Sequence, residues 1–238
     1  MTSLRKTALV AGGFYLITII ASIPALALYG PVLNNPDYIV SSGADTRVLW
    51  GGFLEVITAL ACIGTAVALF PVVKRQNEGV ALGFVAARVL EADVIVVGIV
   101  SLLSVVTLRQ NLAGAAGTDA ASLVTTGKAL VAIHDWTFLL GPGLMPGVNA
   151  LLLGYLMYRS RLVPRVIPVL GLIGAPLLLA SATATMLGIY PQVSVWSAIA
   201  TIPIFAWEPS LGVWLVVKGF KPSAITAGNI ASVGEKGF

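Results

Sequence analysis

Residues 80–107 read VALGFVAARVLEADVIVVGIVSLLSVVT, a long and almost entirely apolar run. Its 28 residues include only three charged ones, Arg88, Glu91 and Asp93. A transmembrane helix needs about 20 predominantly apolar residues to cross the hydrocarbon core of a bilayer. The stretch is therefore long enough to span a membrane, and we expect its charges to face the protein interior or water rather than lipid.

The composition of the whole chain indicates that lipid surrounds it. Of 238 residues, 58% are hydrophobic and 10% are charged, whereas soluble domains carry about 25% charged residues. A soluble domain of this size could not hide so many apolar side chains, because polar groups must cover much of its surface. The formal net charge is +4, but the basic residues form short clusters beside apolar segments. They do not form a basic stripe of the kind that binds a nucleic acid. Membrane lipid is therefore the expected partner.

Apolar runs of membrane-spanning length recur along the chain. We expect an all-α integral membrane bundle of six transmembrane helices, forming a single domain over residues 1–221. Residues 222–238 are rich in Gly, Ser and Ala and are expected to form a flexible cytoplasmic tail. The expected spans are 7–30, 48–70, 80–107, 136–158, 166–188 and 194–217.

The fourth span has an ambiguous beginning. The sequence is almost continuously apolar over 122–158. A single helix of that length would measure about 55 Å, against about 30 Å for the hydrocarbon core. Gly141-Pro142-Gly143 interrupts the run. Either residues 119–134 form an extra interfacial or re-entrant helix before the fourth span, or the Gly-Pro-Gly segment is a hairpin between two short spans.

The distribution of basic residues distinguishes these arrangements. Six spans place ten basic residues on one side of the membrane and three on the other, and Lys and Arg accumulate on the cytoplasmic side. A hairpin at Gly141 would move Arg159, Arg161 and Arg165 to the outer side. It would also leave a span of about 15 residues, which is too short. We therefore predict six spans, a plasma-membrane location and both termini in the cytoplasm.

Several ionisable residues lie where apolar residues are expected. A charge at the centre of a bilayer costs about 2.5–3.5 kcal/mol on insertion scales, so such residues usually face the bundle interior or a water-filled cavity. We predict that they form a buried acid–base cluster, which is the candidate catalytic site. Its expected members are Glu55, Arg88, Glu91, Asp93 and Glu208.

The spacing of these residues indicates how the cluster is built. Arg88 and Glu91 are three residues apart and share one helix surface, whereas Asp93 points about 200° away from Glu91 and is expected to meet a different neighbour. Glu208 precedes Pro209, which frees a backbone carbonyl and makes Glu208 a candidate proton or cation site. Arg88 neutralises one of the four acids, so we expect the others to be protonated or to share a bound cation. Neutral acids that hydrogen-bond between helices are the alternative.

His134 and Asp135 stand at the predicted outer edge of the fourth span. His134 is either an outer-face proton acceptor or an interfacial polar residue. No His-Glu-x-x-His spacing, phosphate-binding glycine loop or nucleophile motif occurs. Cys62 is the single cysteine and lies in an apolar run, which indicates a buried thiol. We predict no metal site and no cofactor-binding motif, and the sequence identifies no cofactor.

Three stretches resemble the bacterial membrane family catalogued as the domain of unknown function 4386. The resemblance covers about residues 5–220, and it implies a bacterial multi-span protein without an assigned activity. The stretches are Arg5-Lys6 through Gly12-Gly13-Phe14-Tyr15-Leu16, then LGYLMYRSRLVPR from Leu153 to Arg165, and WEPSLG from Trp207 to Gly212 with Trp214-Leu215 and Lys218-Gly219-Phe220.

Three functions fit these observations. The first is a membrane-embedded acid–base site that binds or acts on a lipophilic small molecule, with Glu208 as the acid and Glu91 as its partner. The second is a proton- or cation-coupled transporter of a small solute, in which a homodimer would compensate for the small size and the lack of a clear repeat. The third is a non-catalytic membrane component whose polar residues only specify packing.

Overall fold

The computed structural model describes residues 3–41, 43–112 and 119–226. Helices and connecting turns make up this part of the chain, which confirms the all-α prediction. Most of the predicted tail, residues 227–238, lies outside the described residues. The elements are α1 (Ser3–Leu28), α2 (Gly30–Leu33), the 3-10 helix η1 (Tyr38–Val40), α3 (Asp45–Val73), α4 (Glu78–Leu112), α5 (Ala120–Leu140), α6 (Met145–Ser160), α7 (Val166–Met186) and α8 (Val195–Val217).

Six helical stretches are long and apolar enough to cross a membrane. Five of them are α1, α3, α4, α7 and α8, and their ends agree with the predicted spans within five residues. The sixth is the stretch Ala120–Ser160, which comprises α5 and α6 together. The protein is therefore membrane-embedded, with the predicted number of spans.

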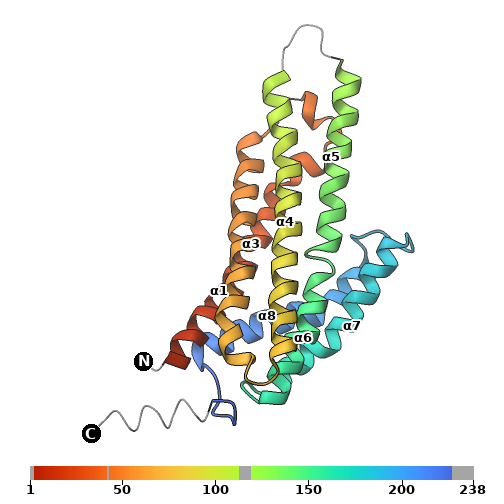
Figure 1. Ribbon diagram of the computed structural model, residues 1–238. Coiled ribbons are helices and arrows are strands. Elements are labelled where there is room, and N and C mark those ends of the chain that lie inside the picture. Colours follow the sequence, from red (N-terminus) through yellow and green to blue (C-terminus); the bar gives the residue numbers. More distant parts are fainter. Residues whose placement is uncertain (1–2, 42, 113–118, 227–238) are drawn as a thin grey trace.

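The structure contains the predicted additional helix, α5, but α5 overlaps the fourth predicted span, 136–158, and that span is not one continuous helix. α5 continues past residue 134 to Leu140, and the chain then makes a short turn before α6 begins at Met145. α6 continues in the same general direction as α5 along α4, so the segment is not a hairpin (Figure 1). A side chain at Gly143 would lie 2.5 Å from the carbonyl oxygen of Leu139, so the turn requires glycine there.

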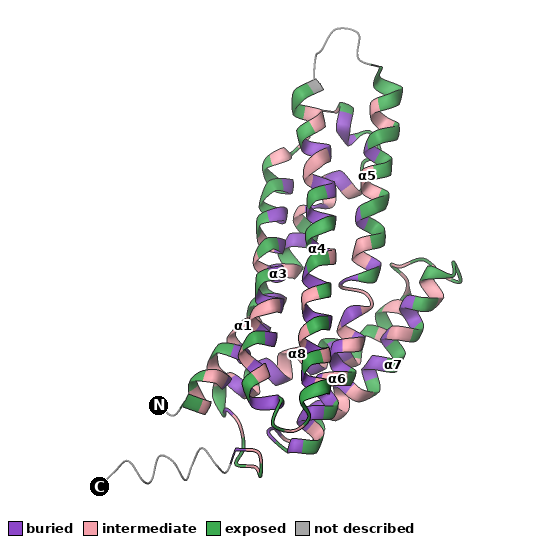
Figure 2. Ribbon diagram, viewed as in Figure 1, coloured by how far each residue is buried: buried purple, intermediate pink, exposed green. Residues whose placement is uncertain are grey.

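The helices close a ring around a shared interior. α1 packs on α3, α3 on α4, and α4 on both α5 and α6; α6 then packs on α7, α7 on α8, and α8 back on α1. α7 and α8 form a hairpin at the lower end of the bundle in Figure 1, and α8 runs behind α3 and α4 back to α1. Buried residues line the facing sides of the helices, and exposed residues face outward (Figure 2). Many of the exposed residues are large and apolar, for example Ile20, Leu60 and Ile202, as expected for a surface in contact with lipid.

Small residues bring distant helices close together. A side chain at Gly12 of α1 would lie 2.7 Å from the carbonyl oxygen of Gly212 in α8. A side chain at Gly171 of α7 would lie 2.8 Å from the ring of Trp207 in α8. Small residues allow such approach between membrane helices, and these contacts set how α8 is rotated toward the interior.

The start of α1 and the end of α8 lie at the same end of the bundle. The guanidinium of Arg5 donates to the carbonyl oxygens of Leu215 at 2.9 Å and Val216 at 2.6 Å. A basic side chain at this position satisfies carbonyl groups that the last turn of a helix leaves free. The first and last membrane-spanning helices therefore have these two ends at the same end of the bundle. That this end faces the cytoplasm stays a prediction from the positive-inside pattern.

At the opposite end, polar contacts hold the loop between α1 and α3. Arg109 of α4 pairs with Asp45 of α3, and its Nε donates to the carbonyl oxygen of Ser41 at 2.7 Å. The hydroxyl of Tyr38 donates to Asp45 at 2.7 Å. These contacts join η1 to the ends of α3 and α4.

Candidate functional site

The centre of the site is an ion pair on α4. Arg88 and Glu91 are one helical turn apart, and Nη1 of Arg88 lies 2.8 Å from Oε2 of Glu91. Both residues are buried, Arg88 almost completely at 1% exposed. The pairing follows from the spacing of three residues, which places both side chains on one surface of the helix.

Two polar side chains from other helices approach this pair. Asn149 of α6 donates from Nδ2 to Oε2 of Glu91 at 2.7 Å. Glu208 of α8 places Oε1 at 3.5 Å from Nη2 of Arg88. Glu91 thus has two close donors, whereas Glu208 faces the same guanidinium at a longer distance.

Tyr15 and Cys62 complete the surroundings of Arg88. The guanidinium lies over the ring of Tyr15 in α1, 5.0 Å from its centroid, which is the geometry of a cation–π contact. Nη1 also lies 3.7 Å from Sγ of Cys62 in α3. Five helices therefore contribute to one buried group, named the Arg88 cluster here: Tyr15, Cys62, Arg88, Glu91, Asn149 and Glu208.

Several polar atoms of the Arg88 cluster lack partners. Nε and Nη2 of Arg88 and Oδ1 of Asn149 are buried without a hydrogen bond to any described residue. The side chain of Glu208 is 18% exposed, compared with 1% for Arg88 and 5% for Glu91. The cluster therefore holds a close pair in its interior and a second, looser acid at its edge.

Glu55 belongs to a separate group with Tyr29 and His134. The hydroxyl of Tyr29 donates to Oε2 of Glu55 at 3.1 Å. The ring of Tyr29 meets the imidazole of His134 edge-on with 5.7 Å between centroids, and the ring of Phe138 stacks on the imidazole with 6.1 Å between centroids. Glu55 and His134 are both buried. We call these three residues, Tyr29, Glu55 and His134, the Glu55 group.

The Glu55 group borders a small cavity of about 10 Å³, which is close to the volume that one water molecule requires. Nδ1 of His134 is buried and has no hydrogen-bond partner within the described ranges. Its distance to Oδ1 of Asp135 is 3.5 Å, too long for a strong hydrogen bond. The cavity is lined by Glu55, Ile95, Gly98, His134, Thr137, Phe138 and Pro142.

The structure divides the residues that the sequence placed in one cluster. Arg88, Glu91 and Glu208 come together, whereas Glu55 lies apart with His134. Asp93 joins neither group because its side chain is exposed. The prediction that Asp93 lies in a buried cluster is wrong, since the interior face of α4 carries Glu91 and Ile95 and a residue two positions from Glu91 points the opposite way.

His134 and Asp135 also separate. His134 was placed at the edge of a span, but α5 continues to Leu140 and His134 is 4% exposed inside the bundle. The side chain of Asp135 is 62% exposed. Among the described residues, no three His, Cys, Asp or Glu side chains are grouped so that they could hold a metal ion.

Tyr15, Tyr29 and Asn149 were not among the predicted site residues. Asn149 is the only asparagine within the six predicted spans, which was a usable signal. Tyr15 and Tyr29 also lie in a predicted span, but a tyrosine near the end of a span is commonly a lipid-interface anchor. Their contacts with Arg88 and Glu55 depend on helices far apart in the sequence.

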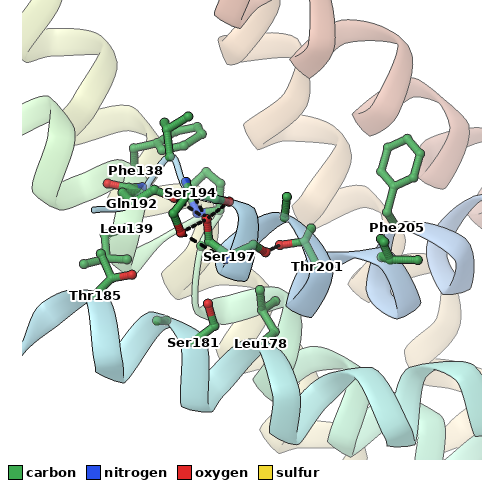
Figure 3. Close-up of a pocket in the computed structure, with 16 residues that line it drawn as sticks. Phe138, Leu139, Leu178, Ser181, Thr185, Gln192, Ser194, Ser197, Thr201 and Phe205 are labelled. Atoms are coloured by element: carbon green, nitrogen blue, oxygen red, sulfur yellow. Dashed lines mark hydrogen bonds between the residues drawn. The ribbon is translucent and has the colours of Figure 1, made fainter. Parts of the chain in front are cut away.

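A larger cavity of about 410 Å³ lies between the α5–α6 turn, α7 and the first half of α8 (Figure 3). Its lining combines apolar side chains such as Leu178 and Phe205 with several hydroxyl groups. The hydroxyls of Thr201 and Ser197 donate to backbone carbonyls, at 2.7 Å and 2.6 Å respectively. The lining residues are Phe138, Leu139, Pro142, Gly143, Leu178, Ser181, Ala182, Thr185, Gln192, Val193, Ser194, Ser197, Ala198, Thr201, Ile202 and Phe205.

The large cavity adjoins the cavity of the Glu55 group. Phe138 and Pro142 line both, so these two side chains form a shared wall. A third cavity, of about 420 Å³, shares Leu139, Thr185 and Gln192 with the large one and extends to the exposed Asp135. The cavities therefore form a series from the protein surface to the buried Glu55 and His134.

Comparisons with known proteins identify the family and nothing more specific. No curated protein and no solved structure matches the chain. The family model described as "Domain of unknown function (DUF4386)" matches residues 10–219, which include both polar groups and the three cavities. Since this match covers most of the 238 residues, the chain belongs to the DUF4386 family of unknown function.

Proposed function

We propose that the protein binds a lipophilic small molecule in the cavity of about 410 Å³ between α5, α7 and α8, and that the adjoining Glu55 and His134 exchange protons with it. The observation that carries this proposal is the shared wall of Phe138 and Pro142 between that cavity and the two buried titratable side chains. Pockets for small molecules have volumes of about 300–1,000 Å³ and a mainly apolar lining with a few polar groups. The large cavity fits this description.

The position of the cavity favours a ligand that arrives from lipid. Phe205 and Ile202 line it and are 57% and 61% exposed, so the cavity borders the outer apolar surface of the bundle. A lipophilic molecule can pass from the bilayer into such a cavity without crossing water. The hydroxyl of Thr201 uses its proton in an internal hydrogen bond to the carbonyl oxygen of Ser197, so its oxygen offers an acceptor site to a ligand that carries a donor.

Glu55 and His134 give this site its acid–base capacity. A carboxyl group and an imidazole in a water-poor environment can hold or release a proton at a positioned atom. Phe138 stacks on the imidazole of His134 and also lines the large cavity, so rotation of this ring would bring a bound molecule close to the imidazole. Phe138 therefore acts as a gate in this proposal.

The test is to identify what the protein retains. Protein extracted from its own membrane into nanodiscs would be analysed by native mass spectrometry, with identification of any small molecule that is released. Ala198 lines the cavity and is exposed, so Ala198→Phe should fill the cavity and remove the bound molecule. Ala180→Phe is the matched control, because Ala180 is exposed on α7 and is not among the lining residues given for the cavity. Equal retention by both variants, or no retained molecule in the wild type, would overturn the proposal.

A proton-coupled transporter is the second candidate, and the arrangement of the two polar groups favours it. The Arg88 cluster and the Glu55 group lie at two levels of the closed ring. Gly98 lines the small cavity together with His134, and it is seven residues from Glu91 along α4, or about 10 Å of helix. In this alternative the protein would act as a homodimer, in which the second copy compensates for the small size of the chain and the lack of a clear repeat. Uptake of the retained molecule into proteoliposomes, driven by an imposed pH gradient, would distinguish transport from binding without transport.

A further inference from the structure

The Arg88 cluster contains one more acid than it has positive charges to pair. Arg88 is the cation, and Glu91 and Glu208 both face its guanidinium. Two carboxylates that share one buried cation leave a net negative charge, which is costly in a region shielded from water. The cluster therefore requires a further positive charge, and a proton or a small cation is the chemistry that supplies one.

The contacts of the two acids differ in a way that locates this charge. Oε2 of Glu91 has two donors, Arg88 at 2.8 Å and Asn149 at 2.7 Å. Those distances are typical of an ionised carboxylate in charge-assisted hydrogen bonds. Glu208 lies 3.5 Å from Nη2 of Arg88, and that nitrogen has no hydrogen-bond partner in the described part of the chain. An ionised Glu208 would be drawn to this free donor, so the longer distance fits a neutral carboxyl group.

We propose that Glu208 is a reversible proton-binding site and that Arg88 is the switch that responds to it. When Glu208 releases its proton, the O–H bond of the carboxyl breaks and the proton passes to a water molecule at the exposed edge of the cluster, which Glu208 alone of the two acids reaches. The carboxylate then competes with Glu91 for Arg88, whose Nη2 already points toward it. When the proton returns, Arg88 pairs with Glu91 alone.

The titratable and charged groups around Glu208 come from three helices. Arg88 and Glu91 face it from α4, Tyr15 from α1 and Cys62 from α3. α6 contributes the neutral amide of Asn149, and the sequence of α7 contains no titratable residue. Arg88 is therefore the positively charged group that responds when Glu208 gains or loses its proton.

The position of Glu208 couples the switch to the large cavity. Glu208 lies on α8, one turn after Phe205, which lines the cavity. A change in the Arg88–Glu208 distance moves α8 relative to α4, and with it one wall of the cavity. The proton site itself does not rest on the proposed ligand, because it is argued only from the Arg88 cluster.

The experiment compares neutral carboxyl groups by infrared spectroscopy in nanodiscs at about pH 7. Glu208→Gln should lose the signal of one neutral carboxyl group relative to the wild type. Glu91→Gln should also lose the signal of one neutral carboxyl group. In this variant Arg88 is free to pair with Glu208, and the pairing stabilises the ionised form of Glu208. Glu78→Gln is the control, since Glu78 is exposed in the first turn of α4, and its spectrum should match the wild type. Glu55 is present in all four proteins, so its contribution cancels.

Two further measurements test for a failure to fold and for binding of a cation other than a proton. Glu208→Asp retains a carboxyl group and should retain a neutral-carboxyl signal, which guards against a glutamine variant that fails to fold. Exchanging potassium for sodium chloride should leave the wild-type signal unchanged. Loss of that signal in sodium would show a cation site instead of a proton site, and an unchanged spectrum in Glu208→Gln would overturn the assignment. None of these measurements uses the ligand, so the result stands whether or not the large cavity binds one.

Discussion

Replacing Arg88 should lower the free energy of unfolding more than replacing its close partner Glu91 does. Arg88→Leu leaves Glu91 buried, with the amide of Asn149 as its remaining donor. Breaking a buried ion pair in this way costs about 3–5 kcal/mol while the remaining group stays charged. Glu91→Leu should cost less than that range, because Glu208 lies 3.5 Å from Arg88 and can take the place of the lost acid.

The double variant Arg88→Leu with Glu91→Leu should recover part of the loss. Both charges of the close pair are then absent, and the main remaining penalty is the unpaired amide of Asn149, about 1–3 kcal/mol. The coupling energy between the two sites should therefore lie near the upper end of the usual range of about 0.5–3 kcal/mol.

The assay is equilibrium unfolding by sodium dodecyl sulfate in mixed micelles, followed by tryptophan fluorescence. Asp93→Leu is the control, because it also removes an acid from α4 but from an exposed position. It should change the free energy of unfolding by no more than about 0.5 kcal/mol. If the double variant loses the sum of the two single losses, Arg88 and Glu91 do not interact and the description of the cluster fails.

Three further predictions concern packing, pH and topology. Gly12→Ala should lower the free energy of unfolding by about 1–3 kcal/mol, because the new methyl group meets the backbone of α8. Gly13→Ala meets no atom within 4 Å and should be neutral or slightly stabilising in the same unfolding assay. Burial and the hydrogen bond to a carboxylate raise the pKa of Tyr38 above its ordinary value. The stability that it contributes is therefore present below about pH 10 and lost above it, so the thermal-stability advantage of the wild type over Tyr38→Phe should shrink as the pH rises through that value. Reporter fusions after Arg165 and near Gln192 should signal cytoplasm and outer side respectively, and an outer-side signal after Arg165 would refute the predicted orientation.

The local part of the candidate site was predictable from the sequence. Arg88 and Glu91 pair as their spacing requires, because residues three apart on a helix share a surface whatever surrounds them. The same rule correctly separated Asp93 from Glu91, but it could not show that the face carrying Asp93 is exposed. That outcome depends on which side of α4 meets α3 and α6, and the contacts that decide this come from other helices.

The sequence alone predicted an all-helical membrane protein of six spans, and Gly141-Pro142-Gly143 indicated an interruption in the fourth, although the predicted span 136–158 ran through it. The length of an apolar run and the positions of proline and glycine act through local geometry. They can therefore be read from the sequence without knowing which helices pack together. Contacts between helices, which the sequence does not show, bring Glu208 and Asn149 to Arg88 and place Glu55 with Tyr29 and His134 beside a cavity. The physical reason is that the rotation of each helix about its own axis is set by contacts such as Gly12 against Gly212, between residues two hundred positions apart.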